Sequence, residues 1–191
     1  MHTTRQVRLK HRQRKRAVQK QECGFWMAVT RNLGVEGAGT TMENVQLDVP
    51  HICVVSLVSA TKKVVGFSLE YCAEEIKFQP AQYIQIQSKG AFRSVMCFRL
   101  EQSFESAVLE KMLGGREPTP EIRDLYLGEY VNILSGHALT MINEAVGQSS
   151  RLTVPIVDDQ QQVEDISYPN DFVVYFTSEY GNMELSMSYE M

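Results

Sequence analysis

The pattern of apolar and polar positions predicts a succession of different elements along the chain. In residues 12–33 a polar, basic first half leads into apolar residues at four-residue steps, which predicts a helix ending near Gly34. Residues 52–58 and 64–71 are rich in β-branched side chains and flank a short polar stretch. We therefore expect these two segments to form a β-hairpin.

The middle of the chain combines strand and helix signals. Residues 83–87 alternate between apolar and polar side chains, and residues 94–100 follow after a turn as another strand. Pro80 argues against a central strand in the residues just before them. Helical spacing returns in residues 102–113, where Phe104 begins a row of apolar side chains.

A long helix is predicted next. Thr119 is a natural N-cap, and Pro120 suits the first helical position because it has no N–H to leave unpaired. Apolar side chains recur from there to about Ala145, and Gly147 is placed to end the helix.

The remaining residues again favour strands. Residues 152–157 are expected to form one strand, and residues 172–177 and 183–188 a closing hairpin around Gly181. The order of elements predicts an α+β fold, in which a β-sheet carries long helices packed on one face.

Charge is distributed unevenly along the 191 residues, although the formal net charge is only −4. Residues 1–20 contain eight Lys or Arg and no acidic residue, so all 23 acidic residues lie in the rest of the chain. We divide the chain into residues 1–40, a basic N-terminal extension with the first helix, and residues 41–191, the main domain. A basic segment of this kind is typical of a solvated extension, and it also occurs in proteins that bind nucleic acid or anionic surfaces.

Composition argues against several classes of protein. No apolar stretch is long enough for a signal peptide or a membrane span, so we expect a cytoplasmic protein without membrane contact. The four cysteines are widely spread without a C-x-x-C pair, and the four histidines form no ligand cluster. We therefore expect no metal site and no disulfide.

The long helix has two distinct faces. One carries an apolar stripe at three- and four-residue steps, composed of Leu127, Val131, Leu134, Ala138, Met141, Ile142 and Ala145. At about 100° per residue, Glu129, Asn132 and Gly136 fall on the other face, with Leu125 and Asn143 close to them. An exposed Glu and Asn on an amphipathic helix are by themselves typical of a solvated face.

The sequence of residues 128–138, GEYVNILSGHA, resembles the signature helix of the CheC/CheX/FliY family of chemotaxis phosphatases. That family has the pattern E-x-x-N, followed by 22 residues and then Pro, which Glu129, Asn132 and Pro155 match. The resemblance covers residues 80–191 well. A single E-x-x-N helix is similar to CheX, whereas CheC has two. One residue departs from the pattern, because Leu125 stands where the family usually has Asp or Ser.

The resemblance implies a CheX-like phosphatase that hydrolyses the aspartyl phosphate of a CheY-like response regulator in two-component signalling. Asn132 would orient the attacking water, and Glu129 would anchor the lysine of the receiver domain. The docking surface would include Leu125, Gly136 and Asn143. Pro155 would have a structural role, shaping the strand behind the helix.

The same resemblance implies that this chain binds no cofactor of its own, because the Mg²⁺ would come with the phosphorylated receiver. It also implies a homodimer formed through sheet edges. Chemotaxis is the commonest setting of the family.

Two alternatives remain open. The same fold could bind a receiver without turnover, as a non-catalytic or flagellar-switch-type scaffold, which Leu125 favours and the pair Glu129 and Asn132 opposes. Residues 5–20 could instead bind nucleic acid, but no aromatic side chains are interleaved with their charges, so we expect no nucleic-acid partner.

Overall fold

The computed structural model describes residues 47–158 and 167–191, and the structural statements below concern these residues. The predicted helix of residues 12–33 and the division at residue 40 lie outside them. The helices are α2 (Val49–Val65), α3 (Gln102–Leu113) and α4 (Pro120–Val146). The strands are β1 (Glu70–Cys72), β2 (Pro80–Gly90), β3 (Arg93–Glu101), β4 (Ser150–Leu152), β5 (Ile156–Asp158), β6 (Asn170–Ser178) and β7 (Gly181–Glu190).

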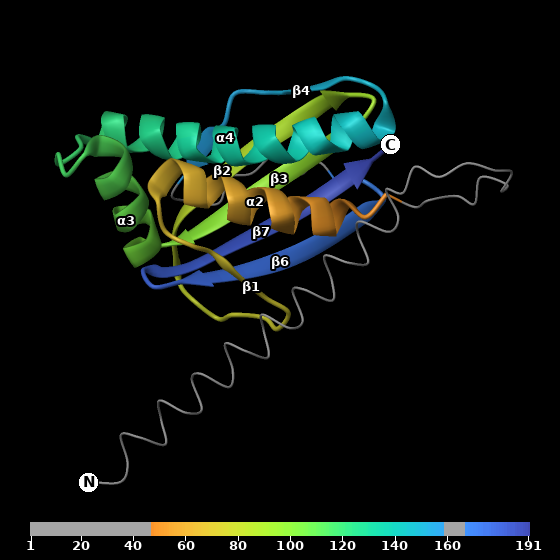
Figure 1. Ribbon diagram of the computed structural model, residues 1–191. Coiled ribbons are helices and arrows are strands. Elements are labelled where there is room, and N and C mark those ends of the chain that lie inside the picture. The colour runs from red at the N-terminus through yellow and green to blue at the C-terminus, as the bar shows by residue number, and fades with distance from the viewer. Residues whose placement is uncertain (1–46, 159–166) are drawn as a thin grey trace, which may run out of the picture. The chain divides into compact units, whose positions relative to one another are not determined.

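The strands form one antiparallel sheet in the order β1-β6-β7-β3-β2-β4, and β5 pairs with β2 farther along the same edge as β4. Figure 1 shows α2 and α4 side by side across one face of this sheet, with α3 at one end. The α+β fold with helices on one face, predicted from the order of elements, is confirmed.

Helix α2 replaces the hairpin that the sequence predicted for residues 52–58 and 64–71, so that prediction was wrong. The helix begins with a good cap, because Asp48 Oδ1 accepts a hydrogen bond of 3.0 Å from the backbone N–H of His51. It ends at Gly66, whose φ of +81° is the left-handed conformation of a helix C-cap. A row of small and apolar side chains, which are Val49, Cys53, Ser56, Leu57, Ala60 and Thr61, is buried at helical spacing.

The predicted strands of residues 83–87 and 94–100 are confirmed as the centres of β2 and β3. Their register places Ile84 opposite Phe98, and both side chains are buried beneath the helices. Pro80 is the first residue of β2, a position at which its missing N–H does little harm to the ladder.

Helices α3 and α4 agree with their predicted bounds. Thr119 caps α4 through a contact of 3.5 Å from the backbone N–H of Ile122 to its hydroxyl, and Gly147 ends the helix at a φ of +71°. The single strand predicted for residues 152–157 is instead two three-residue strands, β4 and β5, separated by residues 153–155. The closing hairpin is confirmed as β6 and β7.

The core lies between the helices and the sheet. Its largest fully buried side chains come from all three helices, from the strands and from the turn between β2 and β3: Leu57, Ile84, Ile86, Phe92, Phe98, Leu100, Phe104, Leu127, Tyr130, Leu134, Ile142 and Phe176. Five of the seven residues predicted for the apolar stripe of α4 are fully buried, whereas Met141 is partly buried and Ala145 is exposed. Burial on this scale holds α4 in one orientation.

Candidate functional site

The outward face of α4 carries the two residues of the E-x-x-N pattern. Glu129 is exposed and Asn132 is half-buried. The Asn132 amide, through Nδ2, donates a long hydrogen bond of 3.5 Å to Glu129 Oε2. The two side chains are therefore neighbours one helical turn apart, as their spacing predicted, and they present a carboxylate and an amide to solvent together.

Burial of the opposite face fixes this orientation. Tyr130, between Glu129 and Asn132 in sequence, is fully buried, and its hydroxyl lies 2.9 Å from the hydroxyl of Thr61 on α2. Burial raises the pKa of the Tyr130 phenol far above its ordinary value, so this group stays neutral. Rotation of α4 about its axis would expose this side chain and break the contact with α2.

Two glycines bring the segment that follows α4 close against the helix. A Cβ on Gly128 would lie 3.7 Å from Pro155 Cβ and 3.6 Å from Val157 Cγ2, and a Cβ on Gly136 would lie 3.9 Å from Leu152 Cδ1. The segment 150–158 thus runs back along α4 at the edge of the sheet, beside β2. This places Pro155 next to Gly128 of the signature helix, and the structural role predicted for Pro155 stays a prediction.

Hydrogen bonds hold this segment at its first residue and again at Thr153. The Asn143 amide donates a hydrogen bond of 3.1 Å to the backbone oxygen of Ser150 and accepts one of 2.9 Å from the Ser150 N–H. Farther along, the backbone N–H of Thr153 donates a hydrogen bond of 2.8 Å to the carbonyl of Gln87. The Gln87 N–H in turn donates one of 3.1 Å to the Thr153 hydroxyl. Asn143 therefore has a structural contact, and the docking role predicted for it stays a prediction.

The first turn of α4 is anchored by an ionic network. Arg123 Nε donates a hydrogen bond of 2.6 Å to Glu105 Oε1 on α3. Arg123 Nη2 donates another of 2.6 Å to Gln82 Oε1 on β2. The carboxylate of Glu105 and the amide of Gln82 are both almost fully buried. The hydrogen bond to Glu105 raises the pKa of the Arg123 guanidinium. The only basic residue in the first half of α4 is thus turned toward the protein.

Leu125 lies on the same face as the E-x-x-N pair, two turns before Asn132, and its side chain is 67% exposed. Gly136 lies one turn after Asn132 and is half-buried beside Leu152. The structure therefore gathers Leu125, Glu129, Asn132 and Gly136 along one row of α4. Asn143 lies at the far end of the helix.

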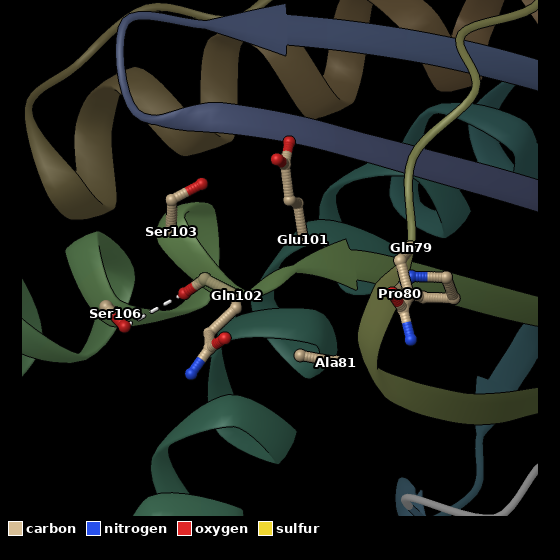
Figure 2. A pocket seen from close by; sticks show the side chains of 7 residues that line it. All are labelled: Gln79, Pro80, Ala81, Glu101, Gln102, Ser103 and Ser106. Carbon is tan, nitrogen blue, oxygen red and sulfur yellow. Dashed lines mark hydrogen bonds between the residues drawn. The ribbon is translucent and has the colours of Figure 1, made fainter.

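A different hollow, of about 640 Å³, opens at the junction of β2, β3 and α3 (Figure 2). Two of its polar side chains are used by the fold. Glu101 Oε2 accepts hydrogen bonds of 2.9 and 2.7 Å from the N–H and side-chain amide of Asn182. The Ser106 hydroxyl donates a hydrogen bond of 2.8 Å to the Gln102 carbonyl. The residues that line the hollow are Gln79, Pro80, Ala81, Glu101, Gln102, Ser103 and Ser106, none of them on α4.

Two kinds of feature are absent from the described ranges. No group of three or more His, Cys, Asp or Glu side chains there is arranged to hold a metal ion. None of the helices described is long and apolar enough to span a membrane.

Sequence reasoning did not single out Arg123 or Val154. Arg123 follows the capped start of α4, where the pattern Thr-Pro-Glu gave no sign of a buried acidic partner 18 residues earlier. Val154 was assigned to the middle of a strand, whereas the structure leaves it 83% exposed between β4 and β5. The neighbouring Pro155 was the available signal, because proline interrupts a strand.

Comparison with known proteins places this fold. No protein-family model matches the chain, and no curated protein matches it in sequence. Among solved structures, the chemotaxis protein CheX from Vibrio vulnificus is similar with a TM-score of 0.65 at 19% identity, over 78% of this chain and 100% of that chain.

Two further structures have the same fold. CheX in the CheX-CheY-BeF₃-Mg²⁺ complex from Borrelia burgdorferi gives a TM-score of 0.62 at 14% identity, over 76% of this chain and 100% of that one. FliY from Thermotoga maritima gives a TM-score of 0.53 at 16% identity, over 74% of this chain and 86% of that one. The resemblance predicted from residues 128–138 and Pro155 is thus confirmed at the level of the fold, and the chain has the fold of the CheC/CheX/FliY chemotaxis proteins, in the CheX-type form.

Proposed function

We propose that this protein binds a CheY-like receiver domain and hydrolyses its aspartyl phosphate. The observation that carries the proposal is the pairing of Glu129 and Asn132 on the solvent-facing side of a helix whose opposite face is buried. The fold supports it, since a CheX of this fold is known in complex with CheY.

The geometry suits a division of labour between the two side chains. The Asn132 amide has both donors and an acceptor, so it can orient a water molecule in line with the phosphorus of the acyl phosphate. The water oxygen forms a bond to phosphorus, the bond to the aspartate oxygen breaks, and the water's protons pass to the phosphate and to solvent. The receiver's aspartate leaves as a free carboxylate.

Glu129 is an anion and would repel a phosphoryl group, so its role is to bind the partner. A carboxylate exposed one turn from Asn132 can accept a charge-assisted hydrogen bond from a lysine of the receiver. The Mg²⁺ in this proposal is bound by the receiver, where it neutralises charge on the phosphoryl oxygens. Both reacting partners would then be aligned by a rigid helix face, which phosphoryl transfer requires more than it requires an ionised base.

The test follows phosphate release from CheY-like receivers that have been phosphorylated with a small-molecule donor, freed of the donor and supplied with Mg²⁺. We expect this protein to accelerate release, Asn132→Ala to lose nearly all of the acceleration while still binding, and Glu129→Gln to bind more weakly. Glu144→Gln is the matched control, since Glu144 is an exposed carboxylate on the same helix.

Two results would contradict the proposal. Binding of a receiver without any acceleration would favour the non-catalytic scaffold. Acceleration that survives Asn132→Ala would remove the water-orienting role from this side chain.

A further inference from the structure

The two most exposed large hydrophobic side chains in the described ranges lie on either side of the candidate site. Val154 is 83% exposed and Leu125 is 67% exposed. Exposed apolar side chains scattered singly are ordinary, but a concentration of them at a functional face is characteristic of an interface. Ile122, one turn before Leu125 and 40% exposed, extends the same surface.

The position of Val154 follows from the packing of the two glycines. Leu152 lies against Gly136 and Pro155 lies against Gly128, at 3.9 and 3.7 Å from the respective Cβ positions. Asn132 is midway between these glycines on the helix. The residues between Leu152 and Pro155, Val154 among them, therefore pass beside the turn of α4 that carries Asn132.

Leu125 approaches the same turn along the helix. Seven residues separate it from Asn132, which is two turns and about 10 Å, and the angular offset is only about 20°. Asn132 is thus flanked by Leu125 along the helix axis and by Val154 across it. A partner that covers Asn132 closely enough to exclude bulk water must contact both apolar side chains.

The exposed charges on the first half of α4 are negative. Glu121 and Glu129 are exposed, Asp124 is half-exposed, and Arg123 is bound to the buried Glu105. Hydrogen bonds from its own backbone N–H and from the Thr119 hydroxyl lower the pKa of Glu121, which keeps that carboxylate ionised. The complementary surface carries basic groups for these carboxylates and apolar groups for Leu125 and Val154.

We propose that Leu125 and Val154 form an apolar rim that selects receiver domains carrying apolar side chains beside their phosphorylation site. This inference rests on the proposed function and adds the determinant of partner choice. Apolar contacts next to the reacting groups bind ground state and transition state alike, so their loss weakens binding without slowing the chemical step.

The experiment measures kcat and KM for dephosphorylation by the wild type, Leu125→Asp and Val154→Asp, and the Kd of each for the unphosphorylated receiver. We expect each substitution to raise KM and Kd at least about tenfold, with kcat nearly unchanged. Val173→Asp is the matched control, because Val173 is 47% exposed on β6, at the opposite side of the sheet. Unchanged unfolding midpoints will show that the variants fold.

The outcomes separate the two proposals. If the wild type binds a receiver without turnover and the rim variants lose binding, the rim stands and the phosphatase function fails. If turnover occurs and KM is unaffected by both variants, the rim is wrong and the phosphatase stands. If the variants instead convert a wild-type dimer into monomers in sedimentation, the rim joins two copies of this chain, which overturns the inference; binding to no receiver overturns both proposals.

Discussion

The hydroxyl groups of Thr61 and Tyr130 lie 2.9 Å apart in the interface between α2 and α4, where both side chains are fully buried. This hydrogen bond joins residues 69 positions apart in the chain. It connects the helix that bears the candidate site to the helix that sequence patterns did not predict. A pair of buried hydroxyls stabilises a fold only while each satisfies the other.

Tyr130→Phe should destabilise the protein by about 1–2 kcal/mol, because the Thr61 hydroxyl then loses its partner inside the core. The double variant Thr61→Val with Tyr130→Phe should recover part of this loss, since neither polar group remains. Urea unfolding measures the free energy of unfolding of the single and double variants. A double variant as unstable as the sum of the single ones would show that the two hydroxyls do not act as a pair.

Alkaline pH should weaken the fold through Cys53. Burial raises the pKa of this thiol from 9.0 to about 12, so the folded protein keeps a proton that the unfolded chain releases. The stabilising contribution is complete below pH 9 and is lost as the pH rises from 9 toward 12, at roughly 1 kcal/mol per pH unit. Cys53→Val should show a shallower decline in urea midpoint over this range, and an unchanged decline would contradict the assignment.

Substituting the two glycines of α4 should separate stability from binding. Replacing either by Ala favours the helix by up to about 1 kcal/mol, and the added methyl groups would meet neighbours only at 3.6 Å or beyond. We therefore expect Gly128→Ala and Gly136→Ala to raise the unfolding midpoint. Because Gly128 is buried and Gly136 lies on the proposed docking row, only Gly136→Ala should weaken receiver binding. Equal effects of both on binding would remove Gly136 from the docking surface.

Removal of the Arg123 side chain should be costly. Arg123→Ala leaves the Glu105 carboxylate, whose side chain is 6% exposed, without its cation, and we expect a loss of about 3 kcal/mol. Arg93→Ala provides the comparison, because its ion pair with Glu190 is partly exposed and worth less than about 1 kcal/mol. Thermal unfolding distinguishes the two. Similar midpoints for both variants would mean that water or another group compensates Glu105.

The candidate site was predictable from sequence because its residues share one helix with clear ends. Thr119 and Gly147 define α4, so residue spacing alone placed Glu129 beside Asn132. The rim was not predictable in the same way. Val154 belongs to a different element, and its position depends on the close packing of residues 152–157 against Gly128 and Gly136.

Helix α2 was mistaken for a hairpin for a physical reason. Its sequence contains many β-branched residues, which have high intrinsic strand propensity, but burial against α4 and the sheet overrides that propensity. Two signals were present and were outweighed: Asp48 with Pro50 marks a helix start, and Gly66 marks an end. A buried residue every third or fourth position, rather than every second, is what separates the two interpretations.

The interruption of the sheet edge at Pro155 has a consequence for self-association. An edge strand with a long run of unpaired backbone groups invites pairing with another chain, but β4 and β5 are three residues each and Pro155 between them has no N–H to donate. This side of the sheet therefore resists growth by strand addition. The predicted homodimer, if formed through sheet edges, is directed to the opposite border, where β1 pairs only with Tyr175–Thr177 of the longer β6. The same proline, whose structural role behind the signature helix stays a prediction, thus also limits edge-to-edge pairing at this border of the sheet.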